Sequence, residues 1–305
     1  MSANANRRRI TRRNPSRGGV KSGPKNPEKP CTCNMCVADA TGNGLKPLRV
    51  ALCLFGQPRR FKDGHKVFMD WLKAPYHHNV TVDVFFHTWF MTPTNGNNNT
   101  FTVSAYRPMP ARDKVIQEGT IDKLIELYNP VAYFEEKPII FDRAMYEDSL
   151  LYSRTNEMGK DNANNTLSQQ YSRQKVRDIL FDYMKQQQVP YDFVIGSRFD
   201  FLIPITVNLN ELQPEMVHLT SCRFPRKHLP DPLIITNTQI FGKLFNVFRN
   251  LANLVNNEVL AKHFYKVCKE LYIFHPEELL HMNYIYYFND NSAFVYHDGI
   301  PNFHW

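Results

Sequence analysis

The sequence predicts an α/β fold. A single domain spans 47–305, with a mainly parallel central sheet and a helical C-terminal part, and a disordered basic leader and linker, 1–46, precedes it. Two observations carry this prediction. Short apolar runs at 48–55, 82–86 and 192–195 have the length of buried strands, and stretches with helical spacing of apolar residues separate them.

The leader is set apart by its composition and charge. Of the 37 Lys and Arg residues and the 29 Asp and Glu residues, nine basic and one acidic lie in 1–30. The remaining residues are therefore neutral overall, which argues against a nucleic-acid-binding core. With almost no large apolar residues, this segment cannot bury enough surface to fold. Two interpretations stay open for it, a polyanion-binding patch and a solvated leader without a specific role.

The cellular compartment of the protein is predicted from three features that the sequence lacks: a secretory signal, a transmembrane helix and a disulfide framework. No apolar h-region follows the basic leader, and no apolar stretch is long enough for a transmembrane helix. Cys31, Cys33 and Cys36 resemble part of a zinc site, but no fourth ligand is near, so a reduced cluster in a linker is the alternative. Without a disulfide framework we expect a reducing compartment, the cytoplasm, or the host cytoplasm or virion if a virus encodes the chain.

The first strand, 48–55, is almost continuously apolar, as expected for a central parallel strand buried on both faces. Gly56 then opens a loop, and apolar spacing over 61–72 predicts a helix packed on the sheet. Ligands of open α/β sheets bind at the carboxyl ends of the strands. Gln57, Arg59 and Arg60 stand at that end, where arginine suits a phosphate.

The second strand, 82–86, leads to His87 and Trp89, again at a carboxyl end. Both side chains can stack on or hydrogen-bond to a base or sugar, and for Trp89 a place at the edge of the core is an equal alternative. The Asn-rich segment 91–110 reads as a loop, and 137–165 as irregular structure.

The rest of the chain supplies the remaining predicted elements. Strands are expected at 131–134, 217–220, 233–241 and 293–296, and helices at 120–128, 166–188, 244–256, 258–272 and 276–288. Glu277 and Glu278 follow Pro276 at the start of the last helix. Pro suits a first helical turn and carboxylates suit the positive helix N-terminus, so helix capping and a catalytic role are both open for the two glutamates.

The most informative stretch is 191–204, in which Arg198 and Asp200 stand between two apolar runs. Residues two apart on an extended backbone share a face, so we expect both to point out of the sheet end. The simplest interpretation is an ion pair that closes the strand. The functional one is a site for an anion with a divalent cation, Arg198 contacting phosphate and Asp200 ligating Mn²⁺ or Mg²⁺.

Six segments in this order make the chain resemble glycosyltransferase-like proteins of bacteria and large DNA viruses, over about 48–287. They are Ala51–Phe61, Val82–Trp89, Ser168–Ser172, Tyr191–Phe201, Asn237–Gly242 and His275–Leu279. The resemblance implies a GT-A-type nucleotide-diphospho-sugar transferase fold. It also implies a nucleotide-sugar donor and a glycan or glycoprotein acceptor.

The resemblance places the donor nucleotide along Gly56 to Arg60. Arg198–Asp200 stands where most such enzymes carry Asp-x-Asp, which leaves Asp200 as the metal ligand, or Arg198 as a direct partner of the diphosphate. Thr238 replaces an expected acid. The candidate catalytic residues are thus Asp200, Glu277 and Glu278, and His87, Trp89 and Arg198 join the donor site. The alternative function is a degenerate transferase fold acting as a binding or structural, virion-associated protein with a polyanion-binding tail.

Overall fold

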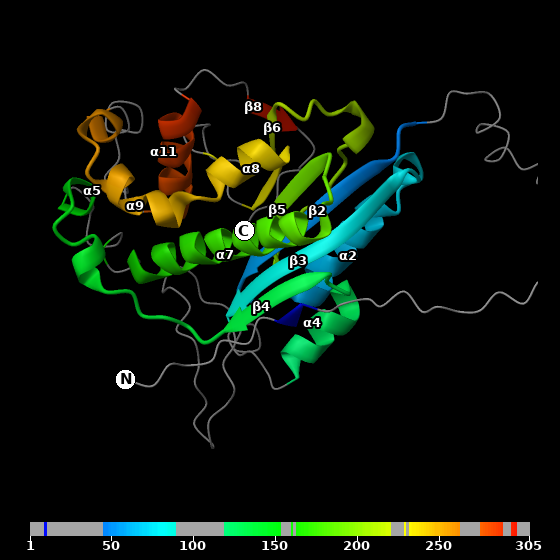
Figure 1. Cartoon of the computed structure of the whole chain (residues 1–305), viewed down its shortest axis with the longest axis horizontal. Helices are drawn as coiled ribbons and strands as arrows, with labels where there is room; N and C mark the ends of the chain where they lie inside the picture. Colours follow the sequence, from blue (N-terminus) through cyan, green and yellow to red (C-terminus); the bar gives the residue numbers. More distant parts are fainter. Residues whose placement is uncertain are drawn as a thin grey trace, which may run out of the picture.

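A mixed eight-stranded sheet forms the centre of the computed structural model (Figure 1), with strand order β1-β4-β3-β2-β5-β7-β6-β8. The structure describes residues 9–10, 45–89, 119–153, 160, 163–220, 229, 232–262, 275–288 and 294–297. The strands are β1 (Arg9–Ile10), β2 (Leu48–Gly56), β3 (Val80–Trp89), β4 (Ala132–Glu136), β5 (Phe193–Arg198), β6 (Val217–Thr220), β7 (Leu233–Thr236) and β8 (Phe294–His297).

The sheet is mixed, but most of its strands run in one direction, as expected for a mainly parallel sheet. β4, β3, β2 and β5 run parallel to one another. β7 is antiparallel to both β5 and β6, and β1 is antiparallel to β4, whereas β6 and β8 are parallel. The expected α/β class is therefore correct, and β1 and β7 are the two strands of this sheet that run against the others.

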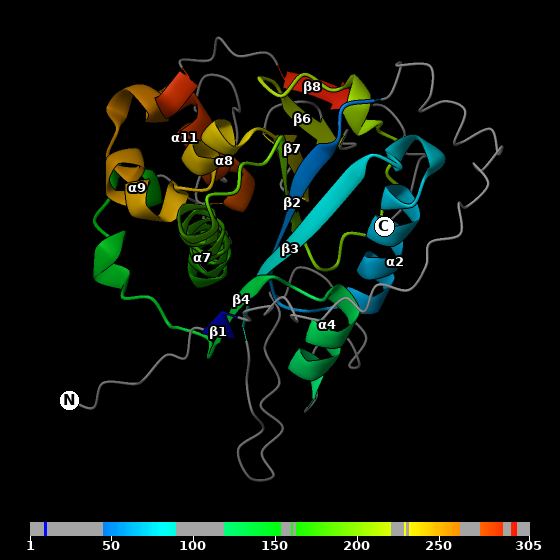
Figure 2. The ribbon, with the colours of Figure 1, turned by 45° about the vertical axis from the view of Figure 1, so that its right-hand side comes forward.

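Helices cover both faces of the sheet. α2 (Phe61–Leu72) and α4 (Thr120–Tyr128) lie on one side, and α7 (Ala163–Gln187) crosses the other (Figure 2). α8 (Thr238–Leu244), α9 (Val247–Val255) and α11 (Pro276–Phe288) gather on the α7 side. The shorter elements are η1 (Pro75–His77), η2 (Arg143–Met145), α5 (Leu150–Ser153) and η3 (Leu209–Glu211).

Successive residues of β2 belong to different cores, as the pleat of a strand requires. Val50, Leu52 and Leu54 pack in the cluster that contains Phe68 and Trp71 of α2. Ala51, Cys53 and Phe55 pack in the cluster built with α7 and the C-terminal helices. The continuous apolar run of this strand is thus explained, because both of its faces are buried.

One predicted strand, 233–241, is too long. β7 ends at Thr236, and the side chain of Asn237 accepts a hydrogen bond from the N–H of Ile240 at 2.8 Å. That is the geometry of a helix N-cap, so α8 begins at Thr238. The other long prediction, a helix over 166–188, is confirmed by α7.

The order of the strands creates a switch point between β2 and β5. From β2 the chain moves outward to β3 and then to β4, and it later returns to place β5 on the opposite side of β2. Ligands of open α/β sheets bind outside the carboxyl ends of the strands at such a point. The segments that follow Gly56 and Arg198 meet this requirement.

Of the leader and linker, 1–46, the structure describes residues 45–46 and β1, whose Arg9 and Ile10 pair with Tyr133 and Ala132 of β4. The rest of 1–44, with the three clustered cysteines, lies outside the described residues, as do 91–110 and 258–272 in large part. Within the described residues, no helix is long and apolar enough to cross a membrane.

Candidate functional site

The loop after β2 has an unusual backbone. Gly56 has a φ of 98°, a conformation open to glycine, and its N–H donates to Ser172 Oγ of α7 at 2.8 Å. Four residues later Arg60 has a φ of 47° and forms the N-cap of α2. A side-chain-bearing residue in the left-handed region is strained. The chain therefore turns sharply at both ends of the segment that carries Gln57 and Arg59.

Gln57 holds Arg59 in place. Its Oε1 accepts a hydrogen bond from Arg59 Nε at 2.6 Å and a second one from Nη2 of the same guanidinium. Arg60 is exposed and forms an ion pair with Asp63 of α2 at 3.0 Å. Of the two arginines predicted for the donor site, Arg59 is thus the one held at the sheet end.

Arg198 and Asp200 form a two-bond fork beyond β5. Arg198 Nε donates to Asp200 Oδ1 and Nη2 donates to Oδ2, both at 2.8 Å. Burial alone would raise the pKa of Asp200, but the charge and hydrogen bonds of Arg198, with the charge of Arg59, hold that pKa below its ordinary value. Asp200 is therefore an ionised carboxylate that lies among positive charges.

The turn that carries this fork is pressed against α2. Phe199 is fully buried between the two charged residues. A Cβ atom on Gly64 of α2 would lie 2.0 Å from the carbonyl oxygen of Phe199, so only glycine permits this approach. The helix that follows the β2 loop and the turn that follows β5 are thereby fixed to each other. Gln57, Arg59, Arg198 and Asp200 form what we call the carboxyl-edge site.

Asp200, which sequence reasoning expected to be a metal ligand, is engaged by Arg198 in this structure. Each of its carboxylate oxygens accepts one hydrogen bond from that guanidinium. The charges of Arg198 and Arg59 both act on this carboxylate, and guanidinium groups are suited to binding anions. The ion pair expected as the simplest interpretation is present, and the metal role of Asp200 stays a prediction.

His87 and Trp89 are interior residues. His87 Nδ1 lies 2.6 Å from Ser172 Oγ, and Nε2 lies 2.9 Å from Glu136 Oε1. Burial lowers the pKa of His87 by more than the charge and hydrogen bond of Glu136 raise it, so the imidazole is neutral. Its Nε2–H then donates a hydrogen bond to Glu136, and its Nδ1 accepts one from the hydroxyl of Ser172. Trp89 is 3% exposed and stacks on Tyr171. Of the two interpretations of Trp89, the structure favours the core.

Sequence reasoning had assigned no role to Ser172 and Glu136, the partners of His87. Together the three residues join β3, β4, α7 and the end of β2 in one buried hydrogen-bonded line, which ends on the N–H of Gly56. A serine inside a helix and a glutamate after a strand carry no local signal of this contact. The line fixes the backbone from which Gln57 and Arg59 project.

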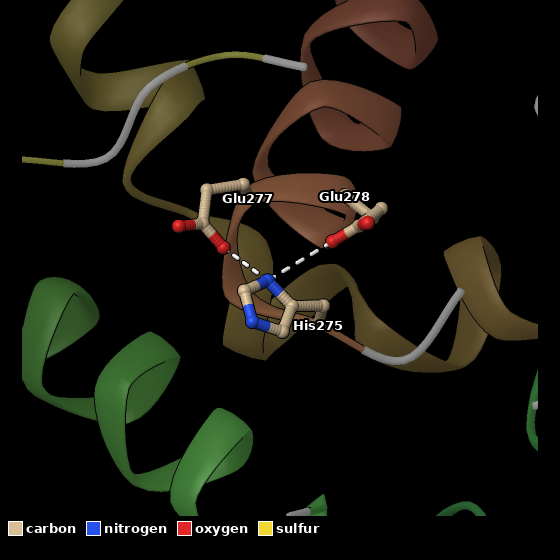
Figure 3. Close-up of side chains that lie close together, drawn as sticks. All are labelled: His275, Glu277 and Glu278. Carbon is tan, nitrogen blue, oxygen red and sulfur yellow. Dashed lines mark ion pairs between the residues drawn. The ribbon is translucent and has the colours of Figure 1, made fainter. Parts of the chain in front are cut away.

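Glu277 and Glu278 meet at the imidazole of His275, the third residue that sequence reasoning had left without a role (Figure 3). His275 Nδ1 forms an ion pair with Glu277 Oε2 and another with Glu278 Oε2 at 3.1 Å. Burial acts to lower the pKa of His275, but its bonds and charge interactions with both glutamates raise it to about 10. We call these three residues the α11 cluster.

The α11 cluster is connected to the carboxyl edge of β2 through one turn of α7. Gln170 donates a hydrogen bond to the carbonyl oxygen of Pro276 at 2.8 Å. Arg173, fully buried, lies with its guanidinium carbon 5.1 Å from the ring centre of Phe55, and its charge helps to lower the pKa of Glu277. Ser172, between them in sequence, holds Gly56.

Comparison with models of known protein families found no match for this chain, and comparison with curated proteins found none either.

Proposed function

We propose that this protein is a glycosyltransferase that moves a sugar from a nucleotide-diphosphate donor to a glycan or glycoprotein acceptor. One observation carries the proposal. Arg198 binds Asp200 through two hydrogen bonds, and the charge of Arg59 acts on the same carboxylate, beyond neighbouring parallel strands at the switch point of the sheet. Anionic ligands with a nucleotide part bind at such points in open α/β folds.

The chemistry of sugar transfer explains the positive charge. As the bond between sugar and diphosphate breaks, negative charge develops on the leaving nucleoside diphosphate. Hydrogen-bond donors held in place around that charge lower the activation barrier. Removing one such donor typically raises the barrier by about 3 kcal/mol. Arg198 presents a planar fork that matches phosphate as well as carboxylate. In this proposal the diphosphate takes over part of the fork that Asp200 now occupies, and Gln57 keeps Arg59 oriented.

The backbone of the β2 loop is the second support. The buried line from Glu136 through His87 to Ser172 holds the N–H of Gly56, the first residue of the loop. A preorganised site loses less conformational entropy on binding. Glu277 and Glu278 remain the proposed catalytic carboxylates because Thr238 offers no acid and the two glutamates are linked to the same edge through α7.

A second candidate is a transferase fold that binds a nucleotide or anion without catalysis. The observation in its favour is that Asp200, the carboxylate expected to hold the metal, is engaged at both oxygens by Arg198. A resting ion pair of this kind suits a binding protein whose metal chemistry has been lost.

Measurement of donor binding and donor turnover on the full chain separates the two. UDP-sugars and GDP-sugars are added with Mn²⁺, and binding is followed by calorimetry while release of the nucleoside diphosphate is followed by chromatography, with and without mixed glycan acceptors. Binding together with release supports the transferase. Binding without release under any acceptor condition supports the second candidate, and the absence of binding by all donors contradicts both.

A further inference from the structure

The α11 cluster offers three possible metal ligands that lie close together. The imidazole of His275 and the carboxylates of Glu277 and Glu278 each supply one ligand atom, and these atoms lie within 4.8 Å of one another. Figure 3 shows both carboxylates turned toward the same imidazole nitrogen, Nδ1 of His275. The three residues come from a single short segment at the start of α11.

We propose that His275, Glu277 and Glu278 bind a divalent cation, and that this place rather than Asp200 is the metal site of the protein. One imidazole nitrogen and two carboxylate oxygens form a mixed donor set that suits Zn²⁺ or Mn²⁺ better than Mg²⁺ or Ca²⁺, which prefer oxygen alone. Three protein ligands leave further coordination positions open, as in metal sites that also bind a substrate.

The local structure holds these donors in place. Pro276 fixes the backbone between His275 and Glu277, and the first turn of α11 brings the carboxylate of Glu278 to Nδ1 of the imidazole. Glu278 is 7% exposed, so its carboxylate is largely out of water, and it lies beside His275 Nδ1. Burying a carboxylate is costly unless a positive charge compensates it; His275 supplies that charge in this structure, and a divalent cation would supply it in the proposed bound state.

The cluster is connected to the carboxyl-edge site through α7. Gln170 ties Pro276 to the same turn of α7 whose Ser172 binds Gly56, so the cluster is coupled to the loop that begins the carboxyl-edge site. Here the inference touches the proposed function, since a cation at this place could act on the same substrate. Binding of the ion itself needs no sugar donor and can be measured without one.

The rival interpretation is a closed ion cluster. His275 in its charged form and Arg173 would balance the two glutamates without a metal. The two interpretations differ in whether a cation displaces the proton shared by the imidazole and the carboxylates, since metal ligands must be deprotonated.

The experiment titrates Mn²⁺ into the full-length chain and follows the free ion by electron paramagnetic resonance. Mn²⁺ is the probe because the thiols of Cys31, Cys33 and Cys36 favour Zn²⁺ and would confuse a zinc titration. The variants are Glu277→Gln and His275→Ala, which change the two less buried residues of the α11 cluster. Asp200→Asn is the matched control, because it removes a carboxylate outside the cluster. Circular dichroism melts check that each variant is folded.

We expect one Mn²⁺ bound per wild-type chain and at least tenfold weaker binding in Glu277→Gln, which is the usual scale for disturbing a metal site. Nitrogen coupling to the bound ion should be present in the wild type and lost in His275→Ala, whereas Asp200→Asn should bind as the wild type does.

No bound Mn²⁺ at millimolar concentration, or equal affinity in the wild type and Glu277→Gln, would overturn the proposal. Loss confined to Asp200→Asn would return the metal to the carboxyl-edge site. Metal binding without sugar transfer would leave this inference standing and contradict the proposed function.

Discussion

Two arginine–aspartate pairs lie at opposite ends of the same sheet. Arg198 and Asp200 meet at 2.8 Å beyond the carboxyl end of β5, with side chains 37% and 12% exposed. Arg49 and Asp83 meet at 2.7 Å near the amino ends of β2 and β3, with side chains 40% and 14% exposed. By distance and exposure the pairs are alike, so neither property tells which one serves a ligand.

Their surroundings differ. Asp83 also accepts a hydrogen bond from the hydroxyl of Tyr191 at 2.8 Å, and the guanidinium of Arg49 lies over the ring of Tyr191 at 5.5 Å. Asp200 instead experiences the charge of a second arginine, Arg59. The amino-end pair is completed by a neutral aromatic residue, whereas the carboxyl-edge pair has a second arginine near it. Guanidinium groups suit anions, so this difference is the one on which the proposed donor site depends.

The comparison is tested most strongly by removing each arginine in turn. Arg198→Ala should weaken binding of UDP or GDP by about tenfold to a hundredfold, because a charge-assisted hydrogen bond is worth about 1.5–3 kcal/mol. Arg49→Ala should change that affinity less than about threefold, since Arg49 lies at the other end of the strands. Calorimetry on both variants, at one fixed salt concentration, measures the difference.

Melting temperatures of the same two samples complete the test. Arg49→Ala removes a contact that joins β2, β3 and Tyr191, so its cost should appear in stability. Equal losses of nucleotide affinity in both variants would show that the carboxyl-edge pair is not special. That result would remove the main support for the proposed site.

A second change disturbs the geometry without touching a charge. Gly64→Ala places a methyl group 2.0 Å from the carbonyl oxygen of Phe199, so α2 or the turn after β5 must move. Overpacking of this kind costs about 1–3 kcal/mol. We expect a lower midpoint in urea unfolding together with weaker nucleotide binding, because Arg198 and Asp200 flank Phe199. An unchanged midpoint would show that the contact is not tight in solution.

Sequence reasoning found the parts of this site that obey a local rule. The carboxyl-end rule for α/β sheets places Gln57, Arg59, Arg198 and Asp200 at one edge, and the structure brings them there. The alternation of β2 between two cores follows equally from its apolar run. These features depend on residues that are neighbours in sequence or on the general direction of strands.

What sequence reasoning missed depends on partners far along the chain. Ser172 binds Gly56 across 116 positions and His87 across 85, and neither contact leaves a trace in helical spacing. The antiparallel direction of β7 was missed for a similar reason, since a short apolar run has no direction of its own. The error at Asn237 was avoidable, because an Asn before a helical pattern is a cap signal.

The pair of Arg198 and Asp200 should also make the stability of the fold depend on pH, an effect smaller than those of the substitutions above. Because the pKa of Asp200 lies below its ordinary value in the folded chain, this carboxylate contributes stability that is complete above its unfolded pKa. The contribution is lost as the pH falls through the folded pKa. Asp200→Asn should therefore be less stable than the wild type at neutral pH, and the gap should narrow in the acid range. Urea melts of both proteins at pH 7, 5 and 3 measure it, and a gap independent of pH would contradict the prediction.

The smallest expected effect is that of replacing Arg60, the last residue of the loop that begins at Gly56. It contrasts with the larger effect expected for its neighbour Arg59. Arg60 is exposed, is paired with Asp63 and has a φ of 47°, so it adds strain without reaching Asp200 in the hydrogen bonds of the described residues. Arg60→Gly relieves backbone strain in the folded chain but increases the conformational entropy of the unfolded chain. These two contributions to the free energy of unfolding have opposite signs, and we expect their sum to lie within about 1 kcal/mol of zero. We expect a change of only a few degrees in the melting temperature and less than a twofold change in nucleotide affinity. Arg59→Gly, the matched variant one position earlier, should lose affinity in the manner of Arg198→Ala. If Arg60→Gly loses as much affinity as Arg59→Gly, then both arginines contact the anion, and the loop must rearrange when it binds.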